Sequence, residues 1–258
     1  MIESLDYKKG SYYGQEGDFA NAGAVRLHSK NSMDNSLIKL GFGEYGYQRL
    51  LLASGYENVV AALDVGRYEG PWEVEQDQEK ISGYVKYSFG DAVNGGNVSF
   101  MGFDNSWSAT DQIPERYVEA GGDRYDSLDP DAGGNTHRYS DGYEGWQDNS
   151  GKNLITNDYV IDYGLELISN YNYALDQVNG DQIRQHDERK IIGGSLLYDI
   201  LPTSAGEWQV GMDIRHDNIS DVGLSKSKEG VIRERTIRHS VEETGVGFFV
   251  QNNHNWTD

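Results

Sequence analysis

The chain has 258 residues, a formal net charge of −20 and no cysteine. The acidic balance argues against nucleic-acid binding, because phosphate contacts need a positive surface. Without cysteine, disulfides, thiol catalysis and cysteine-type metal sites are excluded within this sequence. Glycine (32 residues) and tyrosine (18 residues) are abundant, and hydrophobic residues make up only 37%. This composition favours twisted β-sheet over a helical fold with a large dry core.

The sequence contains no run of eighteen apolar residues, so it predicts no transmembrane helix. Its first residues, MIESLDYKKG, lack the apolar stretch of a secretory signal peptide. We therefore expect either that the protein is not exported or that this sequence is a piece of a longer one.

Residues 1–35 show no clean alternation of apolar and polar side chains, and we expect them to form a separate small element. From residue 36 onward such alternation recurs with a period of two, as it does on the two faces of a β-strand. The pattern predicts an all-β fold with about ten strands and no helix of normal length. The expected strands are 36–43, 47–56, 58–68, 80–89, 97–107, 137–146, 158–173, 188–199, 207–217 and 245–255.

The clearest alternation lies in segment 158–173, and segment 207–217 repeats it. The apolar sides carry Tyr159, Ile161, Tyr163, Leu165 and Leu167 in the first segment and Trp208, Val210, Met212 and Ile214 in the second. The polar sides carry Asp162, Gly164, Glu166, Asn170 and Asn172 in the first and Gln209, Gly211, Asp213 and Arg215 in the second. An apolar outer face and a polar inner face are typical of membrane-spanning barrel strands, and we expect Leu165 to face lipid and Glu166 to face inward. A strand of a soluble sandwich has a similar local pattern.

The predicted connections alternate between short and long. Short connections are expected at 89–97, 146–155 and 200–207, where Gly, Asn, Pro and Ser favour turns. Longer, charged connections are expected at 69–79, 108–136, 174–186 and 218–244. Short turns on one rim and long loops on the other are typical of outer-membrane barrels.

Segment 9–25, KGSYYGQEGDFANAGAV, resembles the last part of the plug domain of TonB-dependent outer-membrane receptors. The segments GRYEGPWE (66–73), SATDQIPER (108–116), SLDPDAGGNTHRYS (127–140), NYALDQVNGDQ (172–182) and VQNNHNWTD (250–258) resemble strands and loops of the same family. The plug-like positions are Lys9, Gly10, Tyr12, Gly17, Asp18, Phe19, Gly23, Ala24 and Val25.

The resemblance implies an antiparallel transmembrane β-barrel of about twenty-two strands with a plug domain inside it. Residues 1–35 would be the end of the plug domain. Residues 36–258 would be barrel strands with long extracellular loops and short periplasmic turns. Since only about ten strands are predicted, the chain is expected to be a central fragment of such a receptor.

The resemblance further implies active transport across the cell outer membrane. Receptors of this family take up an iron-siderophore, a vitamin or an oligosaccharide, and the TonB complex of the inner membrane energises uptake through a segment missing from this chain. We expect contact with a small-molecule ligand and outer-membrane lipid, and no enzymatic activity, cofactor, metal site or nucleic-acid partner. The candidate ligand contacts are the aromatic residues Tyr12, Tyr13 and Trp107. Plug geometry is assigned to Lys9, Gly10, Gly17, Asp18 and Gly23, with Asp18 a candidate partner for an inner barrel arginine.

Other motifs are weak. GFGEYG (41–46) with Asp64 matches a dinucleotide-binding fingerprint, but no further βαβ unit follows, so the glycines are interpreted as hairpin residues. Asp129 and Asp131 hint at a calcium loop, yet Ser140 occupies the position of the EF-hand glutamate. The acidic segment 108–136 is interpreted chiefly as solvated surface. The six histidines lack metal-ligand spacing, and no GxSxG nucleophile motif is present.

Two alternatives remain open. A complete outer-membrane barrel of about ten strands, acting as an adhesin or an enzyme, requires its last strand to pair with its first. A soluble all-β carbohydrate-binding module requires solubility without detergent. Segment 9–25 favours the receptor, because neither alternative accounts for it.

Overall fold

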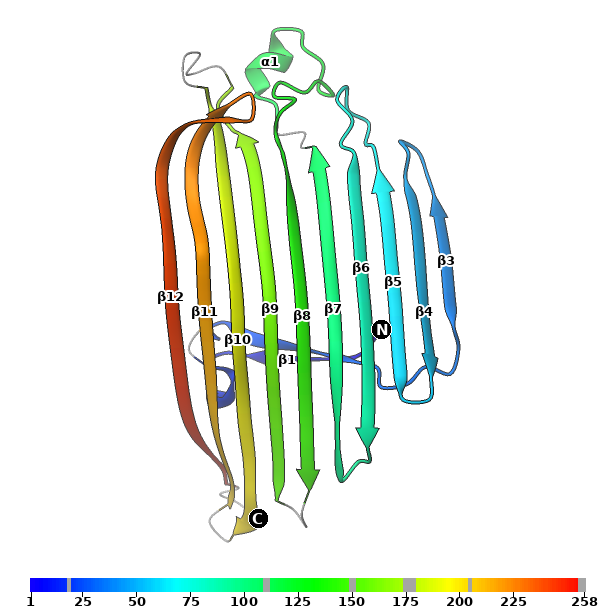
Figure 1. Cartoon of the computed structure of the whole chain (residues 1–258), viewed down its shortest axis with the longest axis vertical. Helices are drawn as coiled ribbons and strands as arrows, with labels where there is room; N and C mark the ends of the chain where they lie inside the picture. Colours follow the sequence, from blue (N-terminus) through cyan, green and yellow to red (C-terminus); the bar gives the residue numbers. More distant parts are fainter. Residues whose placement is uncertain (18–19, 109–111, 149–151, 174–179, 204–205, 255–258) are drawn as a thin grey trace.

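A computed structural model describes the chain except residues 18–19, 109–111, 149–151, 174–179, 204–205 and 255–258 (Figure 1). The fold is all-β, with one antiparallel sheet of ten strands and a separate two-stranded hairpin. Within the described part of the chain, no helix is long and apolar enough to cross a membrane. The prediction of an all-β antiparallel fold is confirmed.

The sheet strands lie side by side in chain order, so each strand pairs with the next one along the sequence. They are β3 (Leu37–Phe42), β4 (Gln48–Tyr56), β5 (Val59–Tyr68), β6 (Gln78–Gly90), β7 (Asn94–Ser108), β8 (Gly133–Asp148), β9 (Asn153–Asn170), β10 (Gln182–Thr203), β11 (Gly206–Lys228) and β12 (Val231–Asn253). Each corresponds to one of the ten predicted strands, which confirms that two-residue alternation identified them. A short helix, α1 (Glu115–Glu119), lies in the β7–β8 connection above the sheet (Figure 1).

The long loop predicted at 218–244 is wrong. β11 continues to Lys228 and β12 begins at Val231, so only Glu229 and Gly230 connect them. Both residues have positive φ, 53° and 70°, as a tight hairpin turn of the primed type requires. The charged residues of this segment belong to strands, because the backbones of β11 and β12 remain paired along it.

Residues 1–35 form strands that their sequence pattern did not predict. β1 (Ile2–Lys9) pairs with β2 (Gly23–Ser29) in an antiparallel hairpin, and η1 (Gly14–Glu16) lies in the connection between them. This hairpin crosses behind the sheet in Figure 1. We call the sheet surface on that side the hairpin face and the opposite surface the free face.

Side-chain contacts between hairpin and sheet identify the hairpin face. The Ser29 hydroxyl lies 2.6 Å from the Tyr84 hydroxyl, and Lys86 Nζ donates to the Ser29 carbonyl at 3.2 Å. Residues directly opposite one another on paired strands share a face. The register therefore extends the hairpin face from Lys86 through Ser99 and Gly142 to Tyr159.

The register also relates the apolar sides of β9 and β11. Tyr159 lies on the hairpin face, and so do the alternate residues up to Leu165, whereas Glu166 lies on the free face. Ile214 on β11 lies on the free face, so the apolar sides of β9 and β11 cannot both face lipid as expected. Polarity within one strand does not fix its face, because pairing with the neighbouring strands decides it.

Candidate functional site

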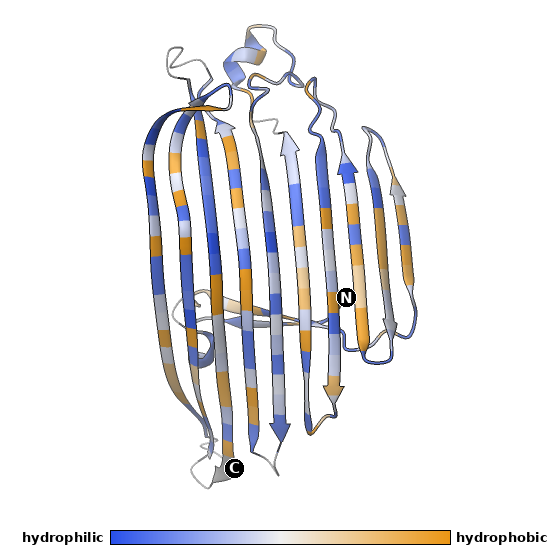
Figure 2. Cartoon of the chain, in the orientation of Figure 1, coloured by the Kyte–Doolittle hydropathy of each residue, from blue (hydrophilic) through white to orange (hydrophobic). Residues whose placement is uncertain are grey.

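The free face carries many exposed apolar side chains, which we call the apolar band. Figure 2 shows apolar and polar residues alternating along the strands that contribute to it. Large exposed apolar patches mark interaction surfaces in proteins. Its principal members are Ile38, Leu40, Phe42, Ile81, Val85, Val98, Phe100, Ile192, Leu196, Met212, Ile214, Val246, Phe248 and Val250.

The apolar band runs obliquely to the rows of paired residues. On β3 it reaches Phe42, above the row that contains Ile38. Following that row strand by strand leads to Glu242 on β12, where the band begins only at Val246. The band thus descends along the strands from β3 to β12, as a flat boundary does when it crosses tilted strands.

Above the band, the free face of the longest strands is charged. Arg184 lies 2.8 Å from Glu166 on β9, and His186 lies 2.9 Å from Asp221 on β11. Arg238 on β12 donates two hydrogen bonds, of 2.8 and 2.7 Å, to the Asp221 carboxylate. Hydrogen bonding from Arg238 and then from His186 lowers the pKa of Asp221 to about 2. We call this group the upper ion-pair cluster.

The hairpin face carries ion pairs on several strands, although its β9 section is apolar. Asp64 on β5 accepts two hydrogen bonds of 2.8 Å from Arg49 on β4, and Lys80 on β6 lies 3.7 Å from the same carboxylate. Farther along the sheet, Arg215 Nε lies 2.6 Å from Asp217 on β11. The two faces of the sheet therefore differ in the side chains that they expose.

A cleft of about 920 Å³ separates the hairpin from the sheet. Hairpin residues such as Asp6 and Arg26 line one side, and Lys86 and Glu144 line the other. Asn97 Nδ2 donates to Glu144 at 2.9 Å within the sheet wall. The alternation of the sequence did not predict that these residues line a cleft, because a single polar residue in a strand does not indicate what lies opposite it.

The connection within the hairpin is held by an ion-pair group around Glu16. Lys8 Nζ lies 2.7 Å from Glu16, and Arg26 lies 3.1 Å from the same carboxylate. Burial opposes ionisation of Glu16, but hydrogen bonding from Lys8 and the charge of Arg26 outweigh it and lower its pKa. Gly14 lies against Phe249 of β12, so this end of the hairpin touches the sheet near its edge.

A buried polar network joins three connections at the upper end of the sheet. Asp129 is only 7% exposed and accepts hydrogen bonds of 2.7 Å from both Asn170 and Gln182. Gln182 Oε1 in turn accepts from the Ser227 hydroxyl and the Gly230 amide at 3.1 Å. Within the described residues, no group of three or more acidic or histidine side chains is arranged to hold a metal ion. In this structure Asp129 ties connections together.

Two of the glycines assigned to plug geometry have a clear steric reason to be glycine. Gly23 has φ of +138°, and a Cβ there would lie 2.3 Å from the Lys8 carbonyl oxygen. Gly10 has φ of +85°, and its Cβ would meet the ring of Tyr12. Gly17 also has positive φ, 72°, but its Cβ would lie in open space.

The remaining predicted site residues lie partly in the hairpin and partly in the sheet. Tyr12 is 87% exposed, Tyr13 lies under the Lys8 ammonium at 5.2 Å, and Lys9 is exposed at the end of β1. Trp107 stands opposite Gly134 at the upper end of β7, above the level at which the hairpin crosses (Figure 1). Asp18 lies outside the described residues.

Comparison with known proteins adds no relative. No family model matches the chain, and the search of curated proteins found no match.

Proposed function

We propose that this chain is part of a TonB-dependent outer-membrane receptor, with β3–β12 as part of the barrel wall and the β1–β2 hairpin as part of the plug. The observation that carries the proposal is the division of the sheet into two faces. An oblique apolar band occupies the free face, and the hairpin lies over the opposite face, which carries Lys86, Glu144 and the ion pair of Arg49 with Asp64.

Bilayer physics supports a lipid contact for the apolar band. Barrel strands that cross a membrane alternate apolar residues toward lipid with polar residues toward the interior. Phe248 and Val250, 78% and 68% exposed, would be costly in water, but lipid would cover them. The charged upper ends of β10–β12 would extend beyond the bilayer on the side of the longer connections.

The two sheet edges support membership in a larger barrel. Within the described residues, β3 and β12 each pair with one neighbour only, and they do not pair with each other. Unpaired backbone groups in a bilayer cost several kcal/mol each, so a membrane sheet must close. A ten-stranded barrel closed between β3 and β12 is therefore less well supported than a wall within a wider barrel.

In this proposal the receptor takes up a scarce nutrient by active transport. The proposed ligand is an iron-siderophore, a vitamin or an oligosaccharide. Ligand would bind on the side of the upper connections, and the TonB complex would act on the plug through a segment outside this chain. Tyr12, Tyr13 and Trp107 remain the proposed ligand contacts.

Fractionation and uptake test the proposal in the host cell. The full-length protein should sediment with the outer membrane and resist extraction by high salt. Growth on limiting amounts of one nutrient from the three classes should require both this gene and TonB. Recovery of the full-length protein in the soluble fraction would refute the membrane assignment, and uptake independent of TonB would refute the transport mechanism.

A further inference from the structure

The apolar band is interrupted where β8 and β9 cross it. On the flanking strands the free face carries residues such as Val85 and Phe100 on one side and Ile192 and Ile214 on the other. On β8 and β9 the corresponding rows carry Asp141 and Val160, Tyr143 and Asp158, and Gly145 and Thr156. Two of these rows therefore place a carboxylate, Asp141 or Asp158, among the apolar residues of the band.

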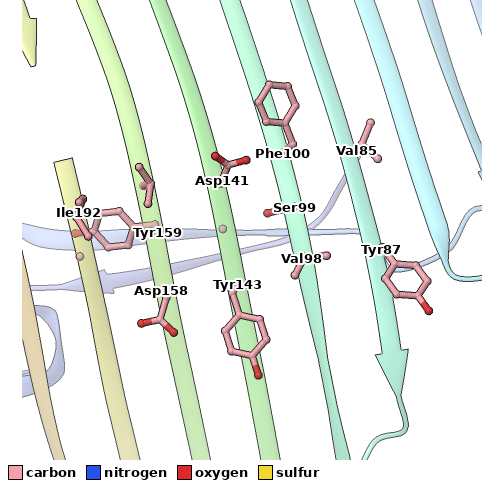
Figure 3. A pocket seen from close by; sticks show the side chains of 13 residues that line it. Val85, Tyr87, Val98, Ser99, Phe100, Asp141, Tyr143, Asp158, Tyr159 and Ile192 are labelled. Atoms are coloured by element: carbon pink, nitrogen blue, oxygen red, sulfur yellow. The ribbon is translucent and has the colours of Figure 1, made fainter. Parts of the chain in front are cut away.

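A hollow of about 600 Å³ occupies this interruption (Figure 3). Its rim is formed by Phe100, Tyr143, Val160 and Ile192, and Asp141 and Asp158 stand within it. An arriving side chain therefore has room to reach the two carboxylates between apolar walls.

Neither carboxylate has a partner in the described part of the chain. Asp141 and Asp158 are exposed and make no hydrogen bond or ion pair there, in contrast to Asp162, which lies 3.8 Å from Lys190. An ionised carboxylate facing lipid is costly, and intramembrane acidic groups are normally paired. Aromatic rings beside the hollow also favour a cation, through their negative faces.

We propose that the hollow over β8 and β9 docks a second membrane protein that inserts a lysine or arginine side chain from an otherwise apolar surface. The inference rests on the proposed membrane location of the free face and adds a partner to it. We infer the partner from charge complementarity. Two unpaired carboxylates between apolar walls would attract a basic side chain that is carried on an apolar segment.

Peptide binding in vesicles tests the proposal. The full-length protein would be reconstituted with a membrane-spanning alanine–leucine peptide that has one central lysine, and energy transfer would report association. A matched peptide with glutamine in place of lysine should bind about tenfold more weakly. The double variant Asp141→Asn/Asp158→Asn should lose that preference, whereas Asp104→Asn, on the same face at the upper border, should keep it.

Flotation with the vesicles, measured first, separates the two proposals. A protein that does not float refutes the membrane location and the docking site together. A protein that floats but binds both peptides equally, or prefers lysine equally in the double variant, refutes the docking site alone. Loss of the preference in Asp104→Asn as well would show that general negative charge, and not the hollow, attracts the peptide.

Discussion

The lower and upper parts of β10–β12 form one continuous set of strands, yet their free faces differ completely. The lower part exposes Ile192, Met212 and Phe248, whereas the upper part pairs Arg184, Asp221 and Arg238 with opposite charges. Backbone pairing is antiparallel in both parts, although the register shifts between β11 and β12 all lie in the upper part. The contrast teaches that strand pairing shapes the sheet, while the side chains on one face decide which solvent it fits.

The largest expected effect is a charge placed in the apolar band. Ile192→Lys should reduce the free energy of folding into vesicles by about 2–4 kcal/mol if the position lies near the bilayer middle. Glu188→Lys, four residues away on the same face of β10 but above the band, should change it by less than about 0.5 kcal/mol. Denaturant titration of the full-length protein in vesicles measures the folding free energy of both variants. Equal losses in the two variants would contradict the proposed difference between the lower and upper parts.

A smaller effect is expected in the network above the sheet. Asp129→Ala would remove the buried carboxylate that accepts hydrogen bonds from Asn170 and Gln182, at a cost of about 1–3 kcal/mol. Hydrogen exchange of the upper connections should accelerate accordingly, while exchange within the apolar band stays unchanged. Asp131→Ala, at an exposed position in the same connection, is the control and should have little effect. Similar acceleration in both variants would mean that Asp129 does not join these connections.

The smallest effect is a pH dependence confined to the upper ion-pair cluster. Because the pKa of Asp221 is about 2 when folded and about 3.9 when unfolded, ionised Asp221 stabilises the folded state above pH 4. That contribution should fade as the pH falls from about 4 to about 2, and salt should weaken it. Exchange of the upper β11–β12 amides should follow this window in the parent protein and lose that component in Asp221→Asn. An unchanged profile in the variant would assign the dependence to other groups.

The sequence predicted the strands of the sheet better than it predicted their faces or their ends. Alternation located all ten strands. It predicted that the apolar sides of both β9 and β11 face lipid, but Leu165 and Ile214 lie on opposite faces of the sheet, a fact that only the register reveals.

The missed features share a physical cause, since each depends on contacts between distant residues. The upper halves of β11 and β12 carry charges that resemble a loop until each is paired across the hairpin, as Arg238 is with Asp221. The β1–β2 hairpin lacks a clean alternation because neither of its two faces is purely apolar or purely polar. Gly10 and Gly23 were identified through a family resemblance, and the structure supplies their steric reason.

Nitroxide accessibility along β11 tests the central claim most directly. The chain has no cysteine, so single cysteines introduced into it at 210, 212, 214, 221 and 223 can be labelled selectively. In vesicles of the full-length protein, labels at 210, 212 and 214 should collide with dissolved oxygen far more than with a water-soluble nickel complex. Labels at 221 and 223 should show the reverse preference. Preference for the nickel complex at all five positions would contradict a lipid-facing apolar band.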